Sequence, residues 1–183
     1  MHTTIVYPDH LHAELETPQG RLTVVATPDA AFVSIDGMGT RPMPDAQKNE
    51  TLEQLKRDPI FIAAHWKDPD VFFQAAGTEK VGDVESRIVD VNAAGAAVRW
   101  FVNPADGHIL KETYLTLGQS GPVQGETVME EWKSLGGLTL PAQRRNRQNG
   151  EESSVVEFKS LEINPAVDPK LFEKPADSSA DKK

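Results

Sequence analysis

The sequence contains no cysteine among its 183 residues. A disulfide, a thiolate nucleophile and a cysteine-ligated zinc site are therefore excluded. Long apolar runs are also missing: the longest, 60–66, is far shorter than the ~18 residues of a membrane-spanning helix. Residues 1–5 lack the charged start and apolar run of a secretory signal, so either the protein is not exported or its signal has been removed. We favour a fragment, because the strand pattern begins partway through a β-meander.

Basic residues are fewer than acidic ones, 19 against 28, which gives a net charge of −9. Such a surface repels phosphate groups, so nucleic-acid binding and charge-driven docking on anionic membranes are disfavoured. The hydrophobic fraction of 38% is ordinary for a globular protein, and the length suits one domain with a real core. We expect one domain over residues 1–175 and a polar, disordered tail over 176–183.

Apolar and polar residues alternate over 10–17, which indicates a strand with one buried face. Leu11, Ala13 and Leu15 form the face expected to be buried. His10 and His12 lie on the other face, with glutamates two and four residues further on. This spacing is compatible with a metal site, but we interpret it as a solvated outer face because no second histidine cluster completes the site.

β-branched and apolar segments alternate with turn residues along most of the chain, which predicts about ten strands in an antiparallel meander. The expected strands are 10–17, 21–27, 31–36, 71–79, 85–92, 97–102, 108–117, 127–135, 143–148 and 154–163. Residues 38–44, which include two prolines, and 118–125 are expected to be loops. The pair Asn149-Gly150 is the strongest hairpin signal in the chain.

The segment 45–57 is rich in Gln, Lys, Glu and Leu and predicts a helix, with Asp45 as its cap. Asp58-Pro59 interrupts it, and 60–66 suits either a second short helix or a buried strand. The expected fold is mainly β with α: a curved antiparallel sheet, or incomplete β-barrel, covered by one or two helices. If the sheet is continuous, this insert covers only part of its concave face and leaves a cavity; a split sheet or a filled interior would contradict that interpretation.

Several short motifs follow one another in a recognisable order. They are YPDHLHAE at 7–14, TPQG at 17–20, 28–37 ending in Asp-Gly, RDPI at 57–60, WFVNPADGHILK at 100–111, LGGLTLP at 135–141 and INPAVDPKLFEKP at 163–175. Their order resembles the LolA-like superfamily of periplasmic lipoprotein carriers, in particular the LolA-like region at the C-terminal end of some M16-type peptidase-like envelope proteins. The resemblance implies an incomplete barrel closed by helices, a hydrophobic cavity for acyl chains, and a periplasmic or cell-envelope location.

Catalytic motifs do not accompany this pattern. The His-x-x-Glu-His zinc motif of M16 peptidases is absent, as is a phosphate-binding glycine loop. Ser120 lacks the Gly-x-Ser-x-Gly context of a nucleophile and is interpreted as a hairpin-loop residue. The basic cluster 144–147 is interpreted as an exposed strand that balances nearby acids, with binding of an anionic headgroup as the alternative. We therefore predict no enzymatic activity, no cofactor and no metal.

The apolar residues are the most informative group for function. We predict that a subset of them lines the cavity and binds a hydrophobic ligand: Phe32, Ile60, Phe61, Trp66, Phe73, Trp100, Tyr114 and Trp132. The expected partner is a lipid or a lipidated protein, held by apolar burial at about 25 cal/mol per Å². The alternative is an accessory or sensor domain that binds a protein partner beside an M16-type peptidase module.

Overall fold

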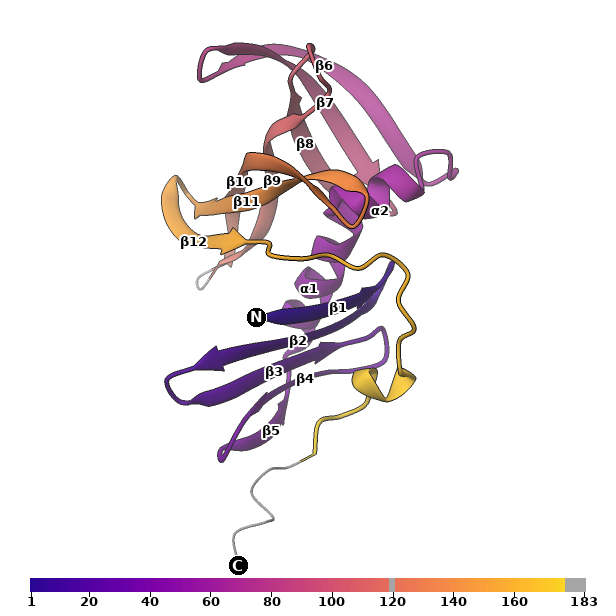
Figure 1. Ribbon diagram of the computed structural model, residues 1–183, viewed down its shortest axis with the longest axis vertical. Coiled ribbons are helices and arrows are strands. Elements are labelled where there is room, and N and C mark those ends of the chain that lie inside the picture. Colours follow the sequence, from indigo (N-terminus) through magenta and orange to yellow (C-terminus); the bar gives the residue numbers. More distant parts are fainter. Residues whose placement is uncertain (119–120, 177–183) are drawn as a thin grey trace, which may run out of the picture. The chain divides into compact units, whose positions relative to one another are not determined.

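The computed structural model describes residues 1–118 and 121–176, so Ser120 and the expected tail beyond residue 176 lie outside the described residues. Its internal contacts divide the chain into two compact units. The five-stranded unit consists of residues 1–64 together with those from 166 onward, and the seven-stranded unit consists of residues 65–165. Each unit has its own antiparallel sheet, in which strands adjacent in sequence are hydrogen-bonded neighbours (Figure 1).

The sheet of the five-stranded unit is a simple meander. Its strands are β1 (His2–Val6), β2 (His10–Thr17), β3 (Gly20–Ala26), β4 (Ala31–Ile35) and β5 (Gly39–Pro42). Short turns join these strands, and polar side chains hydrogen-bond to the backbone of the turns. In the turn between β3 and β4, for example, the Thr27 hydroxyl donates to the carbonyl of Ala30 at 3.0 Å. Val25 and Ala26, at the end of β3, are almost completely buried and form the centre of the core.

Two helices follow this sheet, α1 (Asp45–Arg57) and α2 (Pro59–Ala64). The N-cap of α1 is Pro44, without a side-chain hydrogen bond, so the expectation that Asp45 caps the helix is wrong. The helix ends at Arg57, and Asp58 follows as its C-cap; the Asp58 carboxylate accepts the backbone N–H of Ile60 at 2.8 Å and so begins α2. The helical alternative for this segment is therefore confirmed, and Phe61 and Ile62 are buried.

The C-terminal strap, residues 166–176, returns to the five-stranded sheet. It contains a short 3₁₀-helix, η1 (Pro169–Phe172), which contacts β2 and β3. The Phe172 ring packs edge-on against the His10 ring, with centroids 5.2 Å apart. The Thr40 hydroxyl donates to the carbonyl of Pro175 at 3.2 Å, which anchors the strap at β5.

The C-terminal strap explains why the face of β2 that carries His10 and His12 is not solvated, contrary to the expectation from the sequence. His12 pairs with Val25, so both side chains lie on the face of the sheet that also carries His10. His12 is only 7% exposed and Val25 only 1%. The face that was expected to be solvated is therefore covered, because a segment from the far end of the sequence lies across it.

The sheet of the seven-stranded unit is formed by an uninterrupted run of hairpins. Its strands are β6 (Val71–Val81), β7 (Val84–Ala93), β8 (Ala96–Val102), β9 (Ile109–Gly118), β10 (Gly121–Leu135), β11 (Leu138–Gln148) and β12 (Glu151–Glu157). The sheet is open, with β6 and β12 as its two edges (Figure 1). The predicted hairpin at Asn149-Gly150 is confirmed: both residues have positive φ, 50° and 85°, as a two-residue turn of this kind requires.

The mainly β class with few helices is confirmed, whereas the expectation of one continuous sheet is wrong because the strands form two sheets. Strands β1 and β5 were not expected, and β5 lies in the proline-containing stretch predicted to be a loop. The described residues of 118–125, also expected to be a loop, all belong to β9 and β10, and β12 ends at Glu157 instead of residue 163. The hypothesis of a cavity between one sheet and its insert therefore loses its basis, and any binding surface has to be sought within each unit.

Candidate hydrophobic binding face

The register of the seven-stranded sheet separates its side chains into two contrasting faces. Phe73 pairs with Val91, and Val91 with Val98. In the next row, Val89 pairs with Trp100. Because cross-strand partners share a face, these side chains lie together, and we call this side the aromatic face.

Three of the residues predicted to bind ligand lie on the aromatic face. The rings of Phe73 and Trp100 are tilted against each other, with centroids 6.3 Å apart. Tyr114 follows two residues after Glu112, the partner of Trp100 in β9, and so points to the same side. Phe73 is 45% exposed, so part of this aromatic surface is open to solvent.

Tyr114 is held in place from two directions. Its hydroxyl lies 3.1 Å from the hydroxyl of Thr127. Its ring covers the backbone of Gly125, its partner in β10, so closely that a Cβ there would lie 2.5 Å from a ring carbon. Sequence reasoning missed Gly125, because a glycine within a strand does not reveal which ring lies over it. The aromatic face is thus preorganised around this ring.

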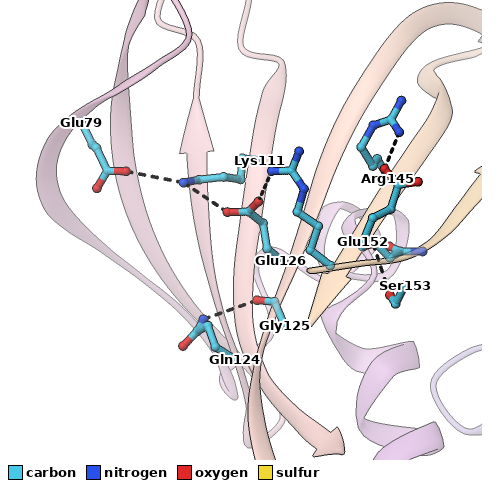
Figure 2. Close-up of polar contacts among 10 residues, drawn as sticks. Glu79, Lys111, Gln124, Gly125, Glu126, Arg145, Glu152 and Ser153 are labelled. Atoms are coloured by element: carbon cyan, nitrogen blue, oxygen red, sulfur yellow. Dashed lines mark hydrogen bonds and ion pairs between the residues drawn. The ribbon is translucent and has the colours of Figure 1, made fainter. Parts of the chain in front are cut away.

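The opposite face carries a ladder of ion pairs, drawn in Figure 2. The Lys111 ammonium lies 3.5 Å from carboxylate oxygens of both Glu79 and Glu126. Arg147 extends the ladder to the next strand, 2.9 Å from Glu126. We call this side the charged face. An acyl chain placed here would remove water from several charges without replacing their hydration.

Two members of the basic cluster of β11, Arg145 and Arg147, contribute to this face and balance nearby acids as expected, whereas Arg144 lies on the other face and packs over the Phe158 ring. Arg145 lies 2.6 Å from Glu152 and 3.4 Å from Glu130. The hydrogen bonds that Arg145 donates to these two carboxylates raise its pKa above the usual value. On the same face Arg99 donates two hydrogen bonds to Asp90, at 2.6 and 2.9 Å, and thereby lowers the pKa of Asp90.

The other predicted ligand-binding residues in the seven-stranded unit lie apart from the aromatic group. Trp66 precedes β6, is 58% exposed and has the Lys67 ammonium 4.8 Å from its ring. Trp132 in β10 stacks on His108, with parallel rings 4.0 Å apart. Neither contacts Phe73 or Trp100 through a ring–ring interaction in the described part of the chain.

Three more of the residues predicted to bind ligand belong to the five-stranded unit. Phe32 in β4 pairs with Val25 and lies on the face that the C-terminal strap crosses. Ile60 and Phe61 are in α2, where Phe61 is 5% exposed and packs against Tyr7 with ring centroids 5.7 Å apart. Phe61 is thus a core residue of its own unit.

The described residues were also searched for a polar pocket, a metal-binding cluster and a membrane-spanning helix. A depression of about 340 Å³ near the tip of the β6–β7 hairpin is lined by Thr78, Glu79, Lys80 and Glu85, all of them polar. Within residues 1–118 and 121–176, no group of three histidine, aspartate or glutamate side chains is placed to hold a metal ion. None of the helices described has both the length and the apolar character needed to cross a membrane.

Comparison with known proteins places the fold. No family model and no curated protein sequence matches the chain. The architecture is similar to that of a solved structure, a DUF1329 family protein from Desulfovibrio piger, with a TM-score of 0.55 over 90% of this chain and 75% of that one. Their sequences are 10% identical, so the likeness concerns the fold alone.

Two other solved structures align more weakly. A LolA superfamily protein from Nitrosomonas europaea has a TM-score of 0.47 at 14% identity, covering 90% of this chain and 81% of that one. A putative outer membrane lipoprotein-sorting protein domain from Vibrio parahaemolyticus has a TM-score of 0.37 at 13% identity, covering 85% and 79%. Neither alignment is close enough to support an argument about ligands.

Proposed function

We propose that this protein is a non-catalytic binding module of the cell envelope that holds the acyl chain of a lipid or lipidated protein. The acyl chain lies on the aromatic face of the seven-stranded sheet. The observation that carries the proposal is that Phe73, Trp100 and Tyr114 share one face, on which the buried Glu112 also lies, whereas the ion-pair ladder occupies the other face. The motif order that resembles the LolA-like superfamily supports the same ligand class and location.

The aromatic face suits a ligand that is recognised by burial. Val91 and Val98 are each only 3% exposed, so the accessible apolar surface of this face is carried by its aromatic residues, above all by Phe73, whose ring meets Trp100. Binding would remove part of the exposed Phe73 side chain from water, and each Å² of apolar surface buried contributes about 25 cal/mol. Few directional contacts are needed, so we expect tolerance toward the headgroup and sensitivity to chain length.

The neighbouring residues Phe72 and Phe73 provide a matched test, because they point to opposite faces of β6. Phe72 is 61% exposed and Phe73 45% exposed. We expect Phe73→Ala to weaken binding of cis-parinaric acid, a fluorescent fatty acid, about fivefold, which corresponds to losing part of one buried phenyl group. Phe72→Ala should change the affinity less than twofold.

The primary measurement is mass spectrometry of lipids carried by the natively purified protein, followed by the fluorescence titration of both variants. Bound lipid together with a selective effect of Phe73→Ala supports the proposal. Equal effects of the two substitutions, or a protein that neither carries lipid nor binds the probe, would contradict it.

A second candidate is an accessory domain that binds a protein beside an M16-type peptidase module. One observation favours protein binding: the edge strand β6 is exposed over most of its length, from Phe72 to Lys80. This candidate predicts a lipid-free protein that captures the peptidase module in a pull-down and is insensitive to Phe73→Ala in the fatty-acid titration.

A further inference from the structure

A buried histidine in the five-stranded unit has no part in the proposed function. His12 is 7% exposed and lies in β2, on the face that the C-terminal strap crosses. Its Nδ1 is buried and has no hydrogen-bond partner among the described residues. Its Nε2 lies 3.9 Å from a carboxylate oxygen of Glu14, which is beyond hydrogen-bond distance. The ring is therefore covered without an acceptor at hydrogen-bond distance in this part of the chain.

These surroundings suit a neutral imidazole and not a charged one. A neutral ring carries a single N–H, and its other nitrogen is only an acceptor. Protonation adds a second N–H, so that both ring nitrogens of a charged His12 require acceptors or water. A charge that is buried without such partners is strongly disfavoured. A protonated His12 is therefore compatible only with a state in which water reaches the ring.

His10, two residues away on the same face, provides a contrast. Its Nδ1 lies 2.7 Å from a carboxylate oxygen of Asp9, and its side chain is 39% exposed. A charge on the His10 ring is paired and hydrated where it is, so it requires no rearrangement. The two histidines have the same chemistry in different surroundings, which makes His10 a matched control for His12.

The strap that covers His12 is weakly attached. No residue of η1 is fully buried. In the described part of the chain, the strap reaches the sheet through the contact of Phe172 with His10 and the hydrogen bond from Thr40 to Pro175. Residues 158–165, which precede the strap, form no helix or strand. Because the strap is not a strand of the sheet, its release leaves every strand pair intact.

Charges on the neighbouring strands do not favour a charged His12. The titratable groups on the same face of β1, β2 and β3 are His2, His10, Glu14, Glu16 and Arg21. Arg21 lies 3.1 Å from Glu16, and its pKa is raised by its hydrogen bond to Glu16 and by the charge of Glu14. Glu14 therefore already balances a cation, and it lies too far from His12 for a hydrogen bond.

The other elements near this face bring no partner for His12 either. The charged groups of the strap are Asp168, Lys170, Glu173 and Lys174. The Asp168 carboxylate accepts the backbone N–H of Lys170 at 3.0 Å and is thus engaged within η1. In α1, which contacts β3, Arg57 is paired with Glu50 at 2.6 Å. A proton on His12 is thus left uncompensated while the strap is closed.

We propose that residues 166–176 form an acid-operated latch on the five-stranded sheet. At neutral pH the His12 ring is uncharged and the strap is closed. As the pH falls, the open state takes up a proton at His12 that the closed state does not, so the equilibrium moves toward opening. Opening uncovers the side of the sheet that carries His12 and the almost completely buried Val25. This device lies in the five-stranded unit and does not depend on a ligand at the aromatic face.

Proton linkage gives the size of the effect. A histidine in contact with water has a pKa of about 6.5. If only the open state binds the proton, the equilibrium constant for opening rises about thirtyfold between pH ~7.5 and pH ~5. One proton can give no more than this, so we expect a rise of about ten- to thirtyfold.

Hydrogen-exchange mass spectrometry on the intact protein measures the opening. Exchange times are scaled with the hydroxide concentration, so that the intrinsic rate of amide exchange is matched at the two pH values. We expect the protection of residues 166–176 to fall about ten- to thirtyfold at the lower pH. Residues 84–102, which contain β7 and β8, should keep their protection, because acid opens the strap and does not unfold the protein.

Three variants assign the effect to one ring. His12→Gln and His12→Leu remove the titrating group and should abolish the pH dependence of strap protection. His10→Gln should leave that dependence unchanged, although it alters the contact with Phe172. Far-UV circular dichroism at both pH values verifies that each variant is folded.

Several results would overturn the latch. They are a strap that is unprotected at neutral pH, a strap equally protected at both pH values, and a parallel loss of protection in residues 84–102. A pH dependence that survives in the His12 variants, or that disappears in His10→Gln, would also overturn it. If neither His12 variant folds, the wild-type protein and His10→Gln decide, because a strap that opens in acid in both supports the latch and any other result contradicts it.

Discussion

The substitution Gly125→Ala tests how tightly the aromatic face is packed. A Cβ at this position would lie 2.5, 2.9 and 3.0 Å from three carbons of the Tyr114 ring, well inside van der Waals contact. The ring has to move by about 1 Å to restore ordinary contact distances, and in moving it loosens the 3.1 Å hydrogen bond to Thr127. Steric strain is therefore coupled to loss of a polar contact.

The magnitude follows from three contributions. Overpacking costs about 1–3 kcal/mol, and the weakened hydrogen bond about 0.5–1.5 kcal/mol. Replacing a strand glycine by alanine returns about 0.5–1 kcal/mol of backbone entropy. We expect a net loss of about 2 kcal/mol in the free energy of unfolding, measured by urea denaturation, and a fall of roughly 4–8 °C in Tm.

A double-mutant cycle decides whether the ring is the cause. In a Tyr114→Ala background the clash is absent, so Gly125→Ala should be neutral or slightly stabilising. If it still costs about 2 kcal/mol there, the strain lies elsewhere in the strand pair and the reasoning is refuted.

Two ion pairs give further predictions. In α1 Arg57 is 5% exposed and its guanidinium lies 2.6 Å from Glu50, so Glu50→Gln should lower the free energy of unfolding by about 3 kcal/mol in urea denaturation. Glu53→Gln, which removes a half-exposed carboxylate 3.9 Å away, should cost less than about 0.5 kcal/mol; equal costs would contradict the argument. In β7 the pKa of Asp90 is lowered by its hydrogen bonds to Arg99, so its stabilisation is present above the unfolded pKa of about 3.9 and is lost as the pH falls through the lower, folded value. The protein loses free energy of unfolding between neutral and strongly acidic pH, and Asp90→Asn should make this loss smaller. The difference should be only a few tenths of a kcal/mol, because both groups are partly exposed. An unchanged or larger loss in the variant would show that the pair is not stabilising.

Local sequence patterns predicted individual elements well. The bounds of β2 and α1 agree with the expected ranges 10–17 and 45–57 to the residue. Period-two alternation and a run of good helix formers each act over one element, so no distant contact is needed to recognise them. The turn at Asn149-Gly150 was predictable for the same reason, because these residue types accept positive φ.

Long-range features were not predictable in the same way. The division into two sheets depends on which strands pair, and local patterns do not encode that choice. Strand β5 lies at a sheet edge, where Pro42 is tolerated, although a proline usually argues against a strand. The burial of His12 depends on a strap that arrives from the other end of the chain.

The candidate site was predictable only in part. Aromatic residues of β6, β8 and β9 were expected to gather, and Phe73, Trp100 and Tyr114 do share a face. The face on which each aromatic side chain lies depends on the register of its strand. A register shift such as the one between Ala75 and Gly77 changes which residues point to which face, and no clear sequence signal announces it. Phe32 was expected in the same cavity and lies in the other unit.

The return of residues 166–176 to the first sheet has a consequence for the order in which the protein matures. The seven-stranded unit is one continuous segment of short hairpins, so all its strands are available before the strap is synthesised. The five-stranded unit waits until the strap emerges from the ribosome, and until then the His12 and Val25 side of its sheet stays uncovered. The unit that is second along the chain is thus the first that can finish folding, and the nascent N-terminal sheet is the part that needs protection from aggregation.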